Sequence, residues 1–102
     1  MHVVIFEFTP HEGAATDRYF ELAGDLRSEI EKQPGFISVQ RFEHVQEKGR
    51  FVSISTWESE AAIRDWKANL THQKAQNEGK TTLFKDYRIR VAEVIRDYTL
   101  KD

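Results

Sequence analysis

The segment at residues 51–72, FVSISTWESEAAIRDWKANLTH, changes its hydrophobic period half-way along and therefore constrains the fold strongly. Its first seven residues alternate, which places Val52 on one face of a strand and Trp57 on the other. Ser59 is a suitable N-cap, and the apolar residues after it recur at helical spacing, with Trp66 on the apolar stripe. A strand that leads directly into a helix whose large aromatic residue faces the sheet forms one wall of an apolar pocket.

The same periodicities predict three further strands and one further helix. The strands are expected at residues 2–9, 36–43 and about 86–98, and the helix at residues 16–32. Thr16 is the expected N-cap of this helix, and Gln33-Pro34-Gly35 is expected to end it, because proline disfavours a helical predecessor and glycine tolerates a positive φ. The helix in the segment described first is expected to break at residues 69–71 and to restart through residue 77.

The predicted order β-α-β-β-α-β is that of an α+β, ferredoxin-like fold, with two helices on one face of a four-stranded antiparallel sheet. Several strands are nevertheless apolar on both faces. In the second strand, alternation assigns Phe36 and Phe42 to one face and Ile37 and Val39 to the other. An uncovered face of this kind would expose a larger apolar patch than monomers tolerate. We therefore expect a homodimer in which two sheets pack face to face.

Composition excludes several classes of function. At 102 residues the chain is expected to form one domain over residues 1–102. Its net charge of −2, with no basic run, argues against nucleic acid or an anionic membrane surface as a partner. The absence of cysteine excludes disulfides, thiolate nucleophiles and Cys-based zinc sites. The apolar N-terminal stretch is too short for a signal h-region or a membrane span, so a cytoplasmic location is expected.

The histidines and glycines do not form a cofactor motif. His2, His11 and His44 fall in separate predicted elements and lack the paired spacing of a metal site. The GKT sequence at residues 79–81 is not a phosphate-binding loop, because Lys74 stands where the first glycine of that motif is required. We therefore expect no metal, flavin or haem cofactor.

Motifs along nearly the whole chain carry a resemblance to a known family. They are the opening strand VVIFEF, the sequences PGFIS and RF of the second strand, WESEAAIRDW at the strand–helix turn, HQKAQ at residues 72–76 and FKDYRIRV at residues 84–91. Together they resemble the antibiotic biosynthesis monooxygenase domain family, small proteins of the dimeric α+β barrel superfamily. The resemblance implies a homodimer that keeps, in each subunit, a pocket between the sheet and its helices.

Some relatives in that family oxidise polycyclic phenolic compounds with O₂ and without metal or flavin, and others degrade haem. This chain departs from both characterised catalytic sets. Haem-degrading relatives carry an iron-ligating histidine where this chain has Gln76, and an asparagine in the region of Ile5-Phe6-Glu7. Quinone-forming relatives carry an asparagine where this chain has Ala62. Neither catalytic set is therefore intact.

The residues and the resemblance together give a candidate site. Trp66 is the candidate substrate platform and His72 the candidate general base, since an imidazole can accept a proton near neutral pH. Phe6, Phe84 and Tyr87 are the candidate substrate-binding residues. A tryptophan on an apolar stripe is more often a core residue, and a histidine at this position is more often a surface residue without a task.

Two functions remain open. The first is a cofactor-independent monooxygenase acting on a small aromatic, phenolic or quinone-like compound. The second is a non-catalytic small-ligand-binding or stress-related dimer with the same fold. Trp66 and His72 favour the first, whereas Ala62 and Gln76 favour the second. Arg88 and Arg90 offer cations for an anionic substrate group, although arginines on strands more often pair with carboxylates such as Glu7.

Overall fold

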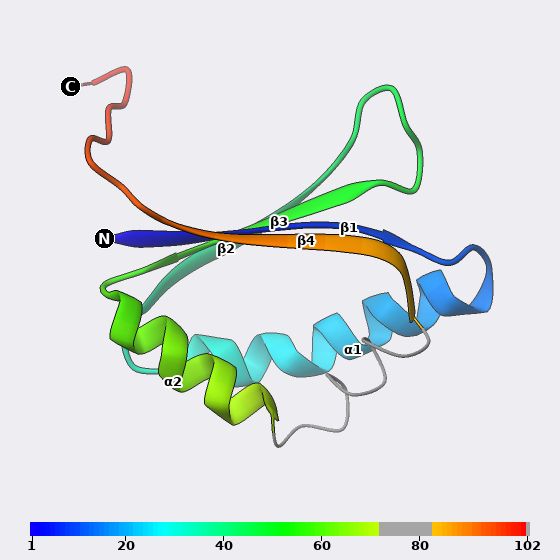
Figure 1. Cartoon of the computed structure of the whole chain (residues 1–102), viewed down its shortest axis with the longest axis horizontal. Coiled ribbons are helices and arrows are strands. Elements are labelled where there is room, and N and C mark those ends of the chain that lie inside the picture. The colour runs from blue at the N-terminus through cyan, green and yellow to red at the C-terminus, as the bar shows by residue number, and fades with distance from the viewer. Residues whose placement is uncertain (72–82, 102) are drawn as a thin grey trace.

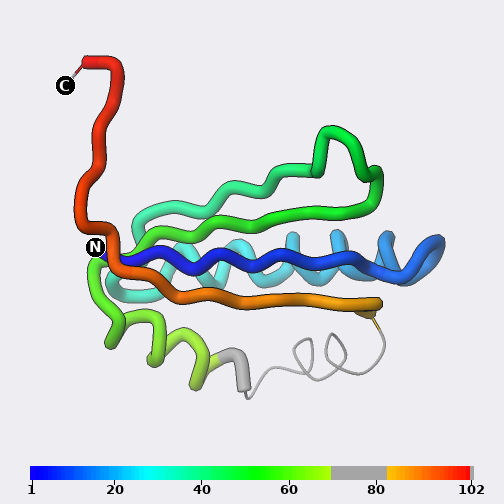
Figure 2. Tube along the Cα trace, turned by 45° about the horizontal axis from the view of Figure 1, so that its top comes forward, coloured from blue at the N-terminus to red at the C-terminus, as the bar shows by residue number. Residues whose placement is uncertain are grey.

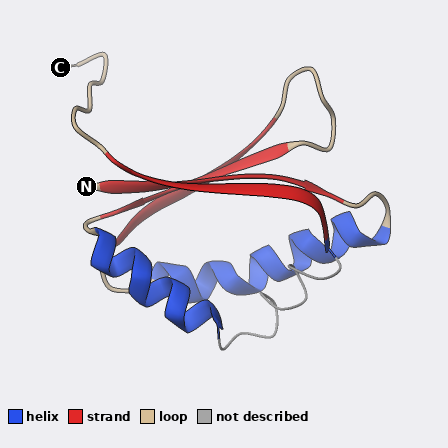
Figure 3. Cartoon of the chain, viewed as in Figure 1, coloured by secondary structure: helices blue, strands red, loops and turns tan. Residues whose placement is uncertain are grey.

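In the computed structural model, two helices lie on one face of a four-stranded antiparallel sheet (Figure 1). The structure describes residues 1–71 and 83–101. The elements are β1 (His2–Pro10), α1 (Ala14–Glu31), β2 (Phe36–Glu43), β3 (Phe51–Trp57), α2 (Glu60–Thr71) and β4 (Phe84–Glu93). The strand order is β2-β3-β1-β4, so the first and last strands of the chain lie side by side (Figure 2). The predicted βαββαβ order and antiparallel sheet are confirmed, with both helices below the sheet (Figure 3).

Helix α1 begins earlier than predicted. Its first residue is Ala14, and Gly13, with a φ of 75°, occupies the N-cap position. Thr16 lies inside the first turn and does not cap it; its hydroxyl donates a hydrogen bond of 2.8 Å to the carbonyl of His11. The predicted start was wrong because it was based on a side-chain N-cap. The helix instead begins after Gly13, whose positive φ a glycine adopts readily. At the other end α1 stops at Glu31, before the predicted stop sequence.

Strand β2 has the predicted bounds, but one of its faces was assigned incorrectly. The register between β2 and β3 shifts between Phe36 and Ser38. Phe36 therefore packs its ring 5.5 Å from the Trp57 ring, on the helix side of the sheet. Phe42 pairs with Val52 on the opposite face. A bulge inserts one extra residue, so strict alternation through it exchanges the two faces.

The core at the start of α2 is built around Trp57. This side chain is fully buried and packs with Ala62, Ile63 and the half-buried Trp66. Its indole N–H donates a hydrogen bond of 2.9 Å to the hydroxyl of the buried Ser55. The buried N–H therefore has a hydrogen-bond partner. The hydrogen bonding of a buried indole explains why a serine occupies the interior of β3.

Helix α2 has the predicted cap. The N–H of Ala62 donates a hydrogen bond of 3.2 Å to the hydroxyl of Ser59. The helix continues through Thr71, so the expected break at residues 69–71 is not present up to that residue. The expected restart beyond it, together with His72 and Gln76, lies outside the described residues.

Strand β4 begins at Phe84 and ends at Glu93, five residues short of the predicted end. After it, the N–H of Val94 donates a hydrogen bond of 3.0 Å to the carbonyl of Met1, and the chain then leaves the sheet on the side away from the helices (Figure 1). Ile95, Tyr98 and Leu100 are exposed on this C-terminal arm, residues 94–101. Within the described residues, neither helix is long and apolar enough to cross a membrane.

Candidate functional site

A cavity of about 620 Å³ lies between the sheet and the helices. Its floor consists of residues on the helix face of the sheet, arranged in two rows that each cross all four strands in the order β2-β3-β1-β4. One row is Arg41, Ser53, Phe6 and Ile89, and the other is Val39, Ser55, Val4 and Val91. This volume is in the usual range for a small-molecule site, roughly 300–1,000 Å³.

The helices form the walls of the cavity. Helix α1 contributes the apolar stripe that its sequence predicts, and the side chains involved are Tyr19, Leu22, Ala23, Leu26 and Ile30. Helix α2 contributes Ile63 and Trp66, and Leu83 at the approach to β4 closes part of the perimeter. The lining is therefore predominantly apolar and aromatic, which suits a ligand with a flat apolar body.

Four of the five predicted site residues meet in this cavity. Phe6, Trp66, Phe84 and Tyr87 all line it. The ring centroid of Phe6 lies 5.6 Å from that of Phe84 and 6.0 Å from that of Tyr87. Phe84 and Tyr87 are 5.9 Å apart, so the three rings form one cluster on β1 and β4. The fifth predicted residue, His72, lies outside the described part of the chain.

Trp66 belongs to the core and to the cavity at the same time. Its ring centroid lies 6.4 Å from that of Trp57, in the cluster at the start of α2. The side chain is half-buried and also lines the cavity. The packing role and the candidate platform role of Trp66 are therefore compatible.

Sequence reasoning missed two polar residues of the cavity, Tyr19 and Arg41. The guanidinium carbon of Arg41 lies 5.5 Å from the centroid of the Tyr19 ring and 5.1 Å from that of Phe20. Burial raises the pKa of Tyr19 above its ordinary value, and the nearby charge of Arg41 partly opposes this. Tyr19 was recognised as an apolar-stripe residue only. Arg41 lies on the strand whose bulge the sequence does not reveal.

Comparison with known proteins gives the family. Residues 1–78 match the model of the family described as "Antibiotic biosynthesis monooxygenase". The chain belongs to this family. Over 94 residues it is 34% identical to "Jasmonate monooxygenase ABM" of Pyricularia oryzae, a match that covers 92% of this chain and 43% of that protein. The chain thus spans less than half the length of this curated relative.

Solved structures show the same fold at low sequence identity. A variant of SnoaB, a cofactor-independent oxygenase from Streptomyces nogalater, superposes with a TM-score of 0.79 at 17% identity, covering 99% of this chain and 97% of that one. Rv0793 from Mycobacterium tuberculosis superposes with a TM-score of 0.81 at 15% identity, covering 96% and 98%. At these sequence identities, the superpositions show that the chains share a fold, which is that of the antibiotic biosynthesis monooxygenase family.

The structure also places Ala62 and the Ile5-Phe6-Glu7 region, which were named above as departures from the two catalytic sets. Ala62 is buried in the core and is not among the described residues that line the cavity. A Cβ built on Gly35 would lie 2.5 Å from the Cβ of Ala62, so these two backbones are in close approach. On β1, Phe6 faces the cavity, whereas Ile5 and Glu7 face the other side of the sheet.

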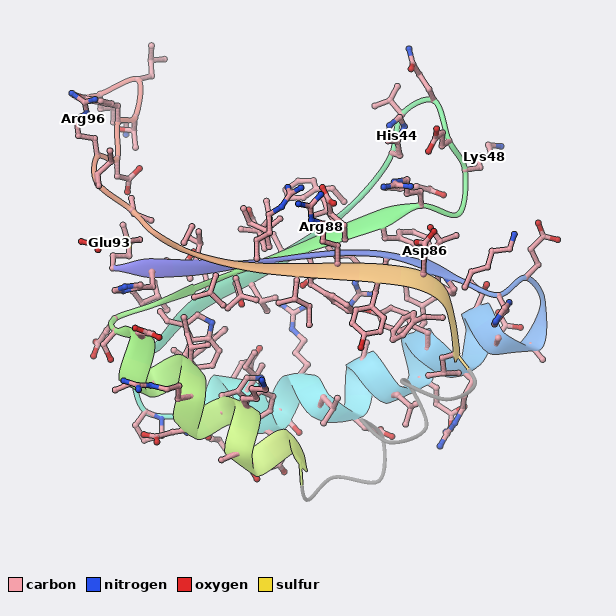
Figure 4. All side chains as sticks on the ribbon, viewed as in Figure 1. His44, Lys48, Asp86, Arg88, Glu93 and Arg96 are labelled. Atoms are coloured by element: carbon pink, nitrogen blue, oxygen red, sulfur yellow. The ribbon has the colours of Figure 1, made fainter. Side chains whose placement is uncertain are left out.

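Arg88 and Arg90, considered from sequence as anion ligands, do not face this cavity. Both lie on the side of β4 away from the helices, and Arg88 projects visibly from that side (Figure 4). Arg90 lies 4.0 Å from the carboxylate of Glu7, which agrees with the alternative prediction that these arginines pair with acids. Among the described residues there is no group of three or more histidine, aspartate or glutamate side chains that could hold a metal ion.

Proposed function

We propose that this protein is a cofactor-independent monooxygenase that oxidises a small aromatic, phenol-like compound with O₂. The observation that carries the proposal is the aromatic cavity of about 620 Å³, with Trp66 in its wall, in a chain of this family. Two similar proteins support it by their names, one a cofactor-independent oxygenase and the other a jasmonate monooxygenase. The aromatic lining supports a flat substrate, and the volume limits the substrate to a few fused rings.

The reaction requires a base, a dry cavity and a substrate that can reduce O₂. In an anthrone, the base removes a proton from the methylene carbon, and the resulting anion transfers one electron to O₂. The two radicals combine to a peroxide anion on the same carbon, and this anion takes the proton back from the base to give a hydroperoxide. Loss of water then leaves a carbonyl, so that one oxygen atom enters the quinone and the other leaves as water with both methylene hydrogens. The protein supplies proton transfer, orientation and exclusion of water.

In this proposal Trp66 stacks on the substrate ring, and the cluster of Phe6, Phe84 and Tyr87 holds its opposite edge. His72, which follows the last described residue of α2, is the proposed base. The assignment of His72 rests on its position in the sequence and on the need for a group that accepts a proton near neutral pH.

Blocking the cavity is expected to suppress oxygen consumption. Ile89 lies on the cavity floor and is 54% exposed, so Ile89→Trp fills the cavity with little loss of core packing. With an anthrone as substrate, we expect the wild type to consume O₂ saturably above the spontaneous rate. In Ile89→Trp the enzymatic rate should fall at least about tenfold, because the substrate can no longer reach the wall that orients it.

The matched control for this experiment is Val45→Trp, because Val45 is 98% exposed in the β2–β3 hairpin and does not line the cavity. Oxygen uptake and the quinone absorbance are measured together. Uptake no faster than the protein-free rate, over a panel of anthrones and hydroquinones, would contradict the proposed activity. So would equal rates in the wild type and in Ile89→Trp.

A second candidate function is a non-catalytic small-ligand-binding dimer. Ala62 favours it, because this position contributes no functional group and is packed against Gly35 in the core. Saturable binding of the same aromatic compounds without oxygen uptake would select this candidate.

We further propose that two copies of the chain associate through the open face, the face of the sheet away from the helices. Its central apolar residues are Val3, Ile5, Val52, Ile54 and Phe42. The exposed apolar residues of the C-terminal arm lie on the same side of the sheet (Figure 1). A second copy offers an identical apolar face, which makes a two-fold, sheet-to-sheet dimer the simplest way to cover it.

A charge on the open face is expected to separate the subunits. Phe42 is 49% exposed, so Phe42→Asp leaves the core intact but places a charge in the proposed interface. Sedimentation should show a wild-type dimer and a folded 12.0 kDa monomer for the variant. Ile89→Asp is the control, because Ile89 is similarly exposed on the other face, and it should remain a dimer. A monomeric wild type at micromolar concentration would refute the dimer.

A further inference from the structure

The first row of the cavity floor is polar at its β2 end and apolar at its β4 end. Along this row, Arg41 on β2 and Ser53 on β3 are followed by Phe6 on β1 and Ile89 on β4. Neighbouring strands lie about 4.8 Å apart, so this row extends over about 14 Å. That length accommodates two or three fused rings with a substituent. A ligand that fills the floor therefore has its apolar body over β1 and β4 and any polar group toward β2.

The charge of Arg41 has no acidic partner in the described part of the chain. No carboxylate of residues 1–71 or 83–101 lies within ion-pair distance of it, and its described contacts are with the rings of Tyr19 and Phe20. Glu43, on the same face of β2, accepts a hydrogen bond of 3.0 Å from the N–H of Gly49. A guanidinium that stacks on aromatic rings keeps its in-plane N–H groups free to donate to an anion.

Two other cations line the cavity, Lys67 and Arg27. Lys67 lies on α2, not on the cavity floor, and is already engaged in an interaction. The guanidinium of Arg27 already donates a hydrogen bond of 3.2 Å to Glu31. Arg88 and Arg90 are on the open face. Tyr19 lies beside Arg41 and, with its raised pKa, keeps its proton at neutral pH and can donate a hydrogen bond.

We propose that the cavity selects an amphiphilic carboxylate, a compound with a flat apolar body and one carboxylate group, and that Arg41 binds this carboxylate. The inference deepens the proposed function, on which it rests for the placement of the substrate in this cavity. A carboxylate fits better than a phenolate because its two oxygens match the two parallel N–H groups of a guanidinium. Binding the carboxylate at β2 places the ring system over Phe6, with its far end at Ile89 on β4.

The proposal is tested with two compounds that differ only in charge and do not react with O₂. Anthraquinone-2-carboxylate and the corresponding primary amide are titrated into the protein by isothermal calorimetry. Because Arg41 is partly solvated, we expect the wild type to bind the acid about five- to tenfold more tightly than the amide. Arg41→Gln should lose this preference while its affinity for the amide stays within about twofold. Raising the salt concentration should weaken binding of the acid alone.

Two further variants control this experiment. Arg88→Gln removes a cation from the opposite face of the sheet and should leave both affinities unchanged. Arg41→Lys keeps the charge without the bidentate fork and should retain part of the preference. Because Arg41 is exposed on an edge strand, the variants are expected to fold, which thermal unfolding verifies.

Each outcome of the titrations bears on the proposal separately from oxygenase activity. Equal affinities of the wild type for acid and amide, no binding of either, or an undiminished preference in Arg41→Gln would each overturn it. Preference for the acid without oxygen uptake on any panel compound would support carboxylate selection and contradict the oxygenase. Oxidation of neutral anthrones without preference for the acid would support the oxygenase and contradict carboxylate selection.

Discussion

Replacement of Gly35 by alanine is expected to destabilise the folded state by about 3 kcal/mol, a large share of the stability of a domain of this size. Gly35 has a φ of 86°, which costs a residue with a Cβ about 1–2 kcal/mol. A Cβ at this position would also lie 2.5 Å from the Cβ of Ala62, which forces α2 to move. The melting temperature should fall by about 15 °C, measured by circular dichroism.

A control variant and a compensating variant separate the two causes. Gly49 also has a φ of 86°, but no atom lies within 4 Å of a Cβ built there, so Gly49→Ala should cost only about 1 kcal/mol. In a double-mutant cycle, Ala62→Gly should relieve about 2 kcal/mol of the effect of Gly35→Ala. Equal destabilisation by the two alanine substitutions would show that close packing against α2 is not the cause.

This contact also positions the cavity wall. The carbonyl of Gly35 accepts a hydrogen bond of 2.8 Å from the N–H of Glu58, two residues before the start of α2. Ala62 and Trp66 lie one helical turn apart on the same side of α2. Displacement of the first turn by Gly35→Ala should therefore shift Trp66 and weaken aromatic ligands even at temperatures where the variant remains folded.

Most elements could be predicted from hydrophobic period and turn residues, and the aromatic part of the site from these together with the family resemblance. The helical stripe of α2 predicted that Trp66 faces the sheet, and Trp66 and the predicted Phe6 both line the cavity. The end of β4 could not be predicted, because the β-branched and aromatic residues Val94, Ile95 and Tyr98 continue after the chain has left its partner strand. Such residues are compatible with a strand, but β4 ends at Glu93, opposite His2, where the neighbouring β1 begins.

The polar half of the site was not predictable for a different reason. Arg41 lies over rings contributed by α1, and this contact depends on the spatial proximity of β2 and α1, which no local pattern encodes. The bulge near Ser38 also changes which side of β2 packs with Trp57, since a shift of one residue exchanges the faces of a strand. Local patterns therefore identified the apolar surfaces, whereas the position of the charge depended on tertiary structure.

The case for His72 depends on how the chain continues after α2. An unbroken helix turns by about 100° per residue, so residues 66 and 72 would point in directions about 120° apart. Because α2 is helical through Thr71, the change of direction that the base assignment requires has to occur at or after that residue. The assignment is therefore best tested by kinetics.

Removal of the base is expected to reduce the rate of oxygen uptake in His72→Ala by about 10²–10⁴, with a much smaller effect on binding. The reason is that the base acts in proton transfer, whereas the aromatic walls hold the substrate in the variant as in the wild type. The wild-type rate should rise with pH over the range in which imidazole loses its proton, and this dependence should disappear in the variant.

His11→Ala, at an exposed histidine that does not line the cavity, is the matched control and should behave as the wild type. Trp66→Phe should instead weaken binding, because it reduces the stacking surface. Equal turnover of the wild type and His72→Ala, with both at saturating anthrone, would exclude His72 as the base.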